Sequence, residues 1–335
     1  MSMKNKQSIL IIAFSGRIGD TLLMTPAIRS ISDHFQGHEI HVMAHKNTIE
    51  ILKHLSFINR LSIISRRSAH VKGYLSFRKH KCGFIFTSPG EEGDNGFIRY
   101  AQRTCHKVAA QTKRKDIFIS SPIYSEGQNV IEYFLQLPRD CGIACDSQYL
   151  SYTVTDTERQ CAHTFLENIL PKDRLLVGLQ LSSFGTRSYR DWPLQSYKDL
   201  CTRLIELNNN IHFIIFGTLS DRPKAGYISN GMDAYVHDCT GMSIRPTAAL
   251  MEQIDLYIGP DTGPSHIMST FNKPMIVMHH CMYPSKQFRR TPCPDYIIYI
   301  DMDTDKPCNE SRSMGEVTVD TVYSYGCKLL GLKKE

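Results

Sequence analysis

The sequence predicts an α/β protein made of two Rossmann-like domains whose parallel sheets face each other across a central cleft. Its 335 residues are too many for one ordinary core and suit two α/β domains. Strand-like and helix-like segments alternate along the chain, which is typical of parallel sheets covered by helices on both faces. The content of 41% hydrophobic and 21% charged residues is that of a soluble globular protein and excludes a disordered or fibrous one.

In the first half, apolar runs predict strands and 3.6-residue apolar spacing predicts helices. The expected elements are a strand at 9–14, a helix from Thr21 or Thr25 to about Phe35, a strand at 39–44, a helix at 47–54 and a strand at 84–87. The stretch from there to residue 119 is basic and rich in turn residues. We therefore expect it to be irregular.

The second half begins with a helix at 157–170, after which Pro171 and Asp173 break the chain. The expected strands lie at 175–181, 212–216, 256–258 and 275–278, and the expected helices at 194–207, 247–253, 264–271 and 317–330. These patterns divide the chain into a domain at 1–156, a linker helix at 157–171, a second domain at 172–316 and a C-terminal helix within 317–335.

The net charge of +6 is unevenly distributed. Residues 60–115 hold thirteen Lys or Arg and three acids, so this window carries 13 − 3 = +10 and the rest of the chain 6 − 10 = −4. A positive field confined to one part of one domain attracts an anionic partner. A solvated basic face is the alternative interpretation.

The cysteines and the N-terminus carry no targeting or metal signal. The eleven cysteines are scattered without zinc-ligand spacing, so we expect free, mostly buried thiols and a reducing, cytoplasmic location. No apolar run approaches the roughly 20 residues of a membrane helix. Lys4 and Lys6 precede the apolar run at 9–14, but Arg17 and Asp20 follow where a leader would be cleaved, so a first strand is the better interpretation.

The first motif, Ser15 to Asp20, joins the first strand to the first helix. Its two glycines, Gly16 and Gly19, flank Arg17, so the three-glycine dinucleotide fingerprint is incomplete and a nicotinamide enzyme is not expected. The glycines are expected to permit a tight turn and close approach of a ligand. Asp20 either caps the following helix or, if that helix begins at Thr25, is free to act as a general base.

The second motif, Asp255 to His266, is the most specific signal in the chain. A strand ends at Gly259, a turn follows, and Pro264 marks the first turn of a helix. The amides of Thr262 and Gly263 at such a helix N-terminus suit a phosphate, and His266 lies one turn further on. For Asp261 a simple turn-forming role is the alternative, and for His266 a structural one.

The segments SGRIGDTLLMTPAIRSI (15–31) and GPDTGPSHIMSTFNKPMIV (259–277) resemble the N-terminal and donor-site signatures of glycosyltransferase family 9, the ADP-heptose:lipopolysaccharide heptosyltransferases. The resemblance covers essentially the whole chain. It implies the GT-B fold, inversion at the anomeric carbon, no metal ion and no cofactor. It also implies that the first domain binds the acceptor, that the second binds the nucleotide sugar, and that the C-terminal helix packs back on the first domain.

The resemblance also assigns roles to residues. Asp20 matches the catalytic base, and Arg190 stands near Trp192-Pro193, where the family usually has a lysine that offsets leaving-group charge. Gly16, Arg17 and Gly19 form an acceptor loop. The residues expected at the donor are Ser182, Ser183, Asp221, Met242, Asp261, Thr262, Gly263 and His266. Asp221 replaces a usual glutamate, and Met242 is equally a core filler.

The expected function is transfer of a heptose from ADP-heptose to an inner-core Kdo or heptose of lipopolysaccharide, by a cytoplasmic protein that can lie at the inner membrane face. Another nucleotide sugar or a protein acceptor is a second possibility. A non-catalytic nucleotide-binding module is a distant third, and nucleic acid is disfavoured because few aromatic residues accompany the basic ones. The acidic run Asp301 to Asp305 imitates a D-x-D metal motif, but it lies far in sequence from any nucleotide loop and is expected to be solvated.

Overall fold

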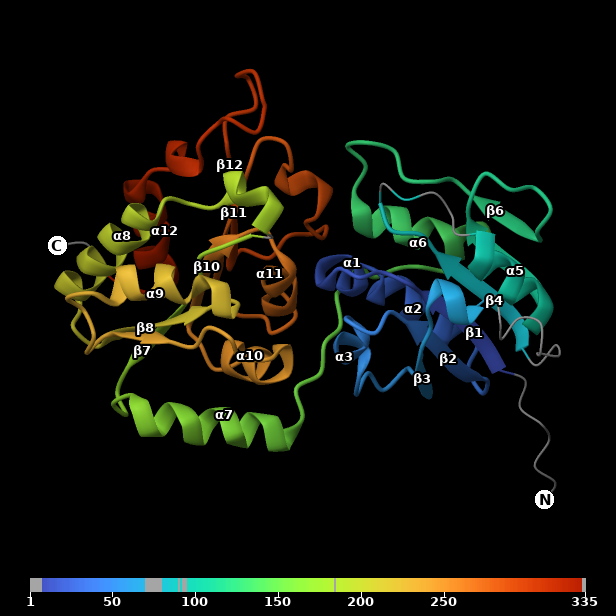
Figure 1. Ribbon diagram of the computed structural model, residues 1–335, viewed down its shortest axis with the longest axis horizontal. Coiled ribbons are helices and arrows are strands. Elements are labelled where there is room, and N and C mark those ends of the chain that lie inside the picture. The colour runs from blue at the N-terminus through green and yellow to red at the C-terminus, as the bar shows by residue number, and fades with distance from the viewer. Residues whose placement is uncertain (1–7, 70–79, 90, 92–94, 184, 333–335) are drawn as a thin grey trace. The chain divides into compact units, whose positions relative to one another are not determined.

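The computed structural model describes residues 8–69, 80–89, 91, 95–183 and 185–332. The chain divides into two compact units (Figure 1). The first holds residues up to Thr153 together with Gln287–Thr291, and the second holds Val154–Lys286 and Pro292 onward. Each unit contains a six-stranded sheet in which every recorded strand pair is parallel. The predicted α/β class with two sheet domains is confirmed.

The first unit has the strand order β3-β2-β1-β4-β5-β6. Its strands are β1 (Ser8–Ala13), β2 (Glu39–Ala44), β3 (Arg60–Ile63), β4 (His80–Phe86), β5 (Cys105–Gln111) and β6 (Ile119–Ser121). Its described helices are α1 (Ile18–Leu23), α2 (Thr25–His34), α3 (Ile49–Leu52), α5 (Asn95–Thr104) and α6 (Val130–Asp140). Apolar side chains of β1 point to both faces and are buried on both, as expected for a central parallel strand.

The second unit has the order β12-β11-β10-β7-β8-β9. Its strands are β7 (Leu175–Gln180), β8 (Ile211–Phe216), β9 (Val236–Asp238), β10 (Leu256–Pro260), β11 (Met275–His279) and β12 (Ile297–Asp301). Its helices are α7 (Asp156–Ile169), α8 (Leu194–Leu207), α9 (Arg222–Ser229), α10 (Ile244–Met251), α11 (Gly263–Met268) and α12 (Val319–Leu329), with a 3₁₀ segment η1 (Gly185–Arg190) between β7 and α8. The strand order repeats that of the first unit and is the Rossmann order in both.

The irregular structure expected between residue 87 and residue 119 is wrong. This stretch contains α5 and β5, and α5 buries Phe97, Ile98 and Ala101 on one side. Its exposed face carries Arg99 and Arg103, four residues apart, so the charges obscured an ordinary amphipathic pattern.

One expected boundary differs in the structure. The helix α7 belongs to the second unit, because Arg159 pairs with Glu252 at 2.7 Å and Arg245 with Glu158, which connects α7 to α10. The last helix, α12, buries side chains in the core of the second unit, and its packing on the first domain stays a prediction.

The start of the first helix also differs from the prediction. Thr25 is confirmed as the start of a helix, α2, whereas Thr21 is not a start because it lies inside α1, which spans Ile18–Leu23. Pro26 lies in the first turn of α2, where its missing N–H costs nothing, so the chain restarts a helix there instead of kinking one.

Among the described residues, no helix is long and apolar enough to cross a bilayer. The expectation of free thiols throughout is also corrected, because Cys281 and Cys308 form a disulfide although 27 residues separate them. Sequence spacing could not reveal this pair, since only the fold of the second unit brings the two cysteines together.

Candidate functional site

Each Rossmann sheet has a point where the strand order reverses, between β1 and β4 in the first unit and between β7 and β10 in the second. Ligands of open α/β sheets bind beyond the carboxyl ends of the strands at this point. The loop that carries Asp20 follows β1, and the loop that carries Asp261 follows β10. Both motifs identified in the sequence therefore lie where each sheet is best able to hold a ligand.

In the first unit, Asp20 lies in the first turn of α1, and its side chain is 14% exposed. Its carboxylate accepts a hydrogen bond from the Ser15 hydroxyl at 3.3 Å and lies 3.6 Å from a guanidinium nitrogen of Arg17. The residue at the N-cap of α1 is Arg17, so Asp20 is not the cap. The capping alternative for Asp20 is therefore wrong, and its carboxylate is paired with Ser15 and Arg17 instead.

The pKa of the Asp20 carboxyl is raised above its usual value. Burial is the main cause, and the nearby Glu91 adds to the rise, whereas the charge of Arg17, the hydrogen bond from Ser15 and the nearby Ser88 lower the pKa. Ser88 and Glu91 belong to the segment after β4, on the other side of the point where the strand order reverses. Sequence reasoning missed both, although the strand-ending Ser88-Pro89 was visible.

The glycines of the first motif behave differently from the prediction. Neither Gly16 nor Gly19 has a positive φ, and Gly19 is already inside α1. A Cβ on Gly16 would meet the His45 ring only at 3.8 Å, an ordinary contact. The turn itself therefore does not require glycine here, and Gly16 and Arg17 lie exposed at the tip of the loop.

In the second unit, Asp261 is buried and contacts two other predicted site residues. Its carboxylate lies 2.8 Å from a guanidinium nitrogen of Arg190 and 3.4 Å from Nε2 of His266. Arg190 also donates to the main-chain carbonyl of Asp261, and its guanidinium carbon lies 4.8 Å from the centre of the Tyr283 ring. Asp261 and Tyr283 thus hold the Arg190 guanidinium in one place from two sides.

Burial alone would raise the pKa of Asp261, but the neighbouring His279, His266 and Arg190 outweigh it and lower the pKa. The carboxyl is therefore an anion that compensates Arg190. Burial lowers the pKa of His266, so its imidazole is neutral at neutral pH and presents one donor and one acceptor nitrogen. This arrangement lets Asp261 hold Arg190 in position, and its direct contact with the donor stays a prediction.

Ser182 and Ser183 follow β7 and join a second polar cluster. Ser182 accepts a hydrogen bond from the ammonium of Lys224 at 2.5 Å, and Lys224 also lies 3.2 Å from Asp191. The amide and hydroxyl of Ser183 both donate to Asp191. Lys224, on α9, is a cation at this edge of the sheet. Sequence reasoning missed it, because nothing in the sequence marks it except its position three residues after Asp221.

Two further residues predicted to bind the donor are Asp221 and Met242. The Asp221 carboxylate accepts hydrogen bonds from the amide and hydroxyl of Thr218 at 2.8 Å each, and only 7% of the residue is exposed. Met242 is half-buried at the start of α10, next to Gly241, whose φ is +84°. Leu219, which is 66% exposed, packs over Gly241 so closely that a Cβ there would come within 2.4 Å.

The helix N-terminus of the second motif is partly satisfied within the chain. The Thr262 amide donates to the Ser265 hydroxyl at 3.0 Å, so it is not available to a phosphate as the sequence suggested. Pro264 has no N–H. The Gly263 amide lies in the first turn of the six-residue α11, where a main-chain N–H has no acceptor within the helix.

The acidic run after β12 behaves as a surface loop. Asp301 accepts hydrogen bonds from the amide and hydroxyl of Ser285 at 2.6 Å, whereas Asp303 and Asp305 are exposed. Among the described residues, none of these three aspartates joins a His, Cys, Asp and Glu cluster dense enough to hold an ion.

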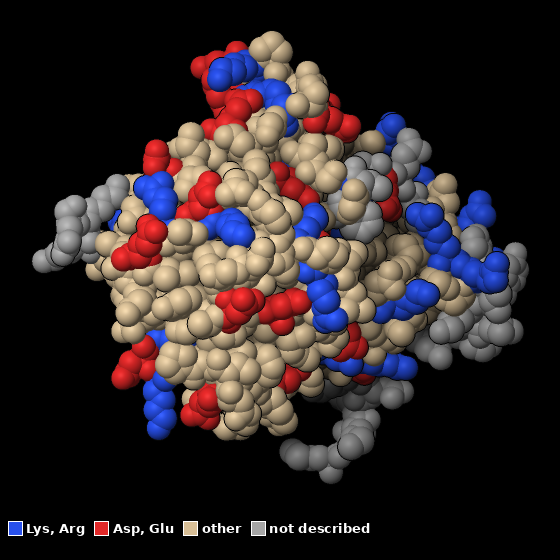
Figure 2. Space-filling model, turned by 60° about the vertical axis from the view of Figure 1, so that its left-hand side comes forward, with Lys and Arg blue, Asp and Glu red and all other residues tan. Residues whose placement is uncertain are grey.

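Nine of the ten described basic residues of the 60–115 window are exposed: Arg60, Arg66, Arg67, Lys81, Arg99, Arg103, Lys107, Lys113 and Lys115. The tenth, Arg114, is paired with Asp116. Lys72, Arg78 and Lys79 lie outside the described residues. Figure 2 shows Lys and Arg side chains gathered on the right of the view, where few acidic side chains are visible.

Comparisons with known proteins identify the family and the fold. The profile of glycosyltransferase family 9 (heptosyltransferase) matches residues 99–294. A search of curated proteins found no match.

Three solved structures share the fold over nearly their full length. The ADP-heptose lps heptosyltransferase II of E. coli has a TM-score of 0.75 at 15% identity and covers 97% of this chain and 98% of its own. A glycosyl transferase family 9 protein of Veillonella parvula has a TM-score of 0.81 at 14% identity, over 98% and 99%. The E. coli heptosyltransferase WaaC with ADP has a TM-score of 0.71 at 16% identity, over 96% and 100%.

The two Rossmann units have the GT-B fold of these glycosyltransferases, and the family profile spans more than half of the chain, from α5 to the segment after η3 (Ser285–Gln287). The chain belongs to glycosyltransferase family 9, the heptosyltransferase family, and is a glycosyltransferase.

Proposed function

We propose that this protein transfers a heptose from ADP-heptose to the inner core of lipopolysaccharide, with inversion at the anomeric carbon. The observation that carries the proposal is the buried Arg190–Asp261–His266 cluster at the carboxyl ends of β7 and β10. It combines a fixed cation with a neutral imidazole at the sheet edge where a diphosphate is expected. The solved relatives are described as acting on ADP-heptose or as holding ADP, which supports the choice of donor.

Departure of ADP places negative charge on the oxygen that leaves the sugar. Groups that are already oriented toward this charge stabilise it most, because they need no rearrangement during the reaction. Arg190 is held by Asp261 and Tyr283, and Lys224 by Asp191 and Ser182. Together with the Gly263 amide, these two cations supply the compensation for the diphosphate, and His266 can donate one hydrogen bond.

The acceptor hydroxyl must lose its proton as it attacks the anomeric carbon. In an inverting displacement the new C–O bond forms as the bond to the diphosphate breaks, and the proton goes to a base. Asp20 is proposed as that base. Its raised pKa makes the carboxylate a stronger proton acceptor than an ordinary aspartate.

Neither a metal ion nor a cofactor is proposed for the transfer step. Arg190 and Lys224, each held by a carboxylate (Asp261 and Asp191), are proposed as the cationic groups beside the donor phosphates. For the nucleoside, we propose that Met242 and the exposed Leu219 contact the adenine and that Asp221 lies near the ribose.

The exposed basic residues of the first unit favour an anionic acceptor. Kdo and phosphorylated lipid A are both anionic, and they lie at the cytoplasmic face of the inner membrane, where basic surfaces are attracted. We therefore propose that the first unit binds the acceptor and that the protein is cytoplasmic, with peripheral membrane contact. The alternatives are another nucleotide sugar or a protein acceptor, and a module that binds nucleotide without catalysis.

The purified full chain, incubated with a panel of nucleotide sugars and a Kdo-bearing lipid A acceptor, tests the proposal. We expect ADP-heptose to give a product heavier by one heptose and other donors to give little. Mass spectrometry of lipopolysaccharide from a strain lacking the protein should show a core shortened by one heptose. Turnover with a different donor, or ADP binding without any transfer, would instead support one of the alternatives.

The pH dependence of transfer should report the ionisation of Asp20. The base acts only when ionised, so kcat/KM should fall as pH decreases through its raised pKa, at a higher pH than an ordinary aspartate would require. Ser15→Ala removes the 3.3 Å hydrogen bond that stabilises the carboxylate and should move this acidic limb to still higher pH. Ser32→Ala, on α2, is the control, and an acidic limb that stays in place in Ser15→Ala would argue against Asp20 as the base.

A further inference from the structure

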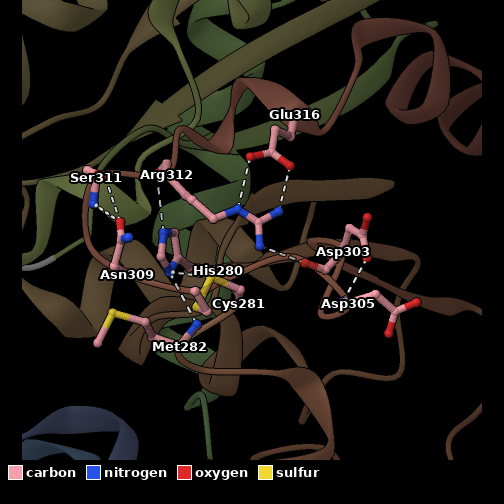
Figure 3. Close-up of a disulfide and its surroundings, with 10 residues drawn as sticks. His280, Cys281, Met282, Asp303, Asp305, Asn309, Ser311, Arg312 and Glu316 are labelled. Carbon is pink, nitrogen blue, oxygen red and sulfur yellow. Dashed lines mark hydrogen bonds and ion pairs between the residues drawn. A yellow bond between two sulfur atoms is a disulfide. The ribbon is translucent and has the colours of Figure 1, made fainter.

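The loops that follow β11 and β12 bring together a group of soft ligands that neither the transfer chemistry nor the sequence motifs use. The Nδ1 or Nε2 atom of His280 and the sulfur atoms of Cys281 and Cys308 all lie within 4.8 Å of one another. His280 and Cys281 are buried, whereas Cys308 is exposed, so the cluster is reached from solvent on one side. Figure 3 shows the disulfide between the two cysteines with the imidazole of His280 beside it.

The His280 ring is oriented as a metal-binding imidazole is. Its Nε2–H donates to the main-chain carbonyl of Arg312 at 3.2 Å, so Nδ1 carries the lone pair. That nitrogen lies 3.8 Å from the sulfur of Cys281 and accepts a 3.3 Å hydrogen bond from the Met282 amide, which a bound ion would replace (Figure 3). Metal-binding histidines typically donate their second ring N–H to a carbonyl or carboxylate, which fixes the ring and directs the other nitrogen toward the ion.

The charges around the cluster do not oppose a cation. The nearest guanidinium, that of Arg312, is neutralised by Glu316 through hydrogen bonds of 3.0 and 2.6 Å. Arg312 also donates to the main-chain carbonyl of Asp303. Figure 3 shows the carboxylates of Asp303 and Asp305 on the same loop, where Lys306 lies 3.6 Å from Asp303 and 3.7 Å from Glu316.

We propose that Cys281, Cys308 and His280 bind a soft divalent cation, Zn²⁺ above all, when the disulfide is reduced. A dithiol reductant supplies two electrons and two protons to open the S–S bond, and binding of Zn²⁺ then releases the two thiol protons as two thiolate–zinc bonds form. Two thiolates and one imidazole with a water in the fourth position make an ordinary tetrahedral zinc site. In a reducing compartment a disulfide does not persist, which favours the metal-bound form there.

The site lies apart from the groups proposed for transfer. The His280 ring contacts the Tyr189 ring, with centroids 5.0 Å apart, and Tyr189 immediately precedes Arg190 in η1. The ion would therefore connect the loop after β11 to the loop after β12, next to η1, which contains Arg190. This assignment departs from the expectation of no metal ligands, because residues 27 positions apart show no zinc spacing in the sequence.

Cobalt binding to the full-length protein tests the proposal directly, since Co²⁺ occupies zinc sites and reports its ligands by absorption. After reduction and removal of the reductant under anaerobic conditions, we expect one equivalent of Co²⁺ to produce thiolate-to-cobalt charge-transfer absorption, and one equivalent of Zn²⁺ to displace it. Cys308→Ser should lower the affinity by about 100-fold or more, and His280→Gln by at least about 10-fold. Cys161→Ser, which changes an exposed cysteine on α7, should behave as the parent protein does.

Two results would overturn the proposal. The first is a reduced parent protein that shows no thiolate–cobalt absorption, or shows one that persists unchanged in Cys308→Ser. The second is a disulfide that withstands the reductant in the folded protein, so that native-state thiol titration finds Cys281 and Cys308 unreactive, because the pair would then be a permanent covalent link. Circular dichroism of each variant confirms that a lost signal does not reflect unfolding.

Discussion

Asp20→Asn should lower kcat by about 10²–10⁴-fold, the usual contribution of a general base, while leaving ADP affinity unchanged. The amide has nearly the same shape as the carboxylate and can still accept the hydrogen bond from Ser15. It cannot take a proton from the acceptor hydroxyl. Nucleotide binding is expected to persist because the proposed donor groups all belong to the second unit.

The measurement is steady-state transfer from ADP-heptose together with calorimetric titration of ADP. Asp33→Asn makes the same chemical change at an exposed position on α2 and should retain full activity. A loss of ADP affinity equal to the loss of kcat would mean that Asp20 supports binding and not proton transfer. A variant with nearly full activity would remove Asp20 from the mechanism.

Arg190→Gln should lower kcat by about 10²–10³-fold, the effect of removing one preorganised group that stabilises transition-state charge. It should also destabilise the second unit. The partner carboxylate of Asp261 is 7% exposed and would be left without its guanidinium, and breaking such a buried pair from one side costs about 3–5 kcal/mol. Thermal unfolding and transfer kinetics measure the two effects separately.

The double variant Arg190→Gln/Asp261→Asn separates stability from catalysis. Removing both charges should restore most of the stability, because no buried ion is left unpaired, whereas activity should stay low. Arg203→Gln, which breaks an exposed pair with Asp320 in the same unit, is the control and should change neither quantity much. Recovery of activity together with stability in the double variant would show that Arg190 serves the fold alone.

The sequence predicted the central strands well, and the physical reason is their burial on both faces. The predicted strands at 9–14, 39–44 and 175–181 coincide with β1, β2 and β7 within a residue or two. The peripheral elements were harder. Three-residue strands such as β6 and β9 have too few residues to show a period, and α5 carries charges that obscure its apolar face.

The loops that carry the site were predicted by chemistry that is local in the chain. A strand, a turn with Asp or Gly, and a helix start are all contained within about a dozen residues, as in Asp255 to His266. The partners of these loops were not predictable in this way. The pair between Arg190 and Asp261 spans 71 residues, and Lys224 meets Ser182 across 42.

Patterns between near neighbours in the sequence thus predicted the fold class and the family signatures. They also made Asp20, Arg190 and His266 candidate site residues. Tertiary structure decided that Asp261 compensates Arg190, that Asp221 accepts hydrogen bonds from Thr218, and that Cys281 meets Cys308 beside His280. The reason is physical. Hydrophobic periodicity and turn chemistry act between near neighbours, whereas ion pairs, pKa shifts and soft-ligand clusters depend on distances of a few ångströms that only the packed sheets establish.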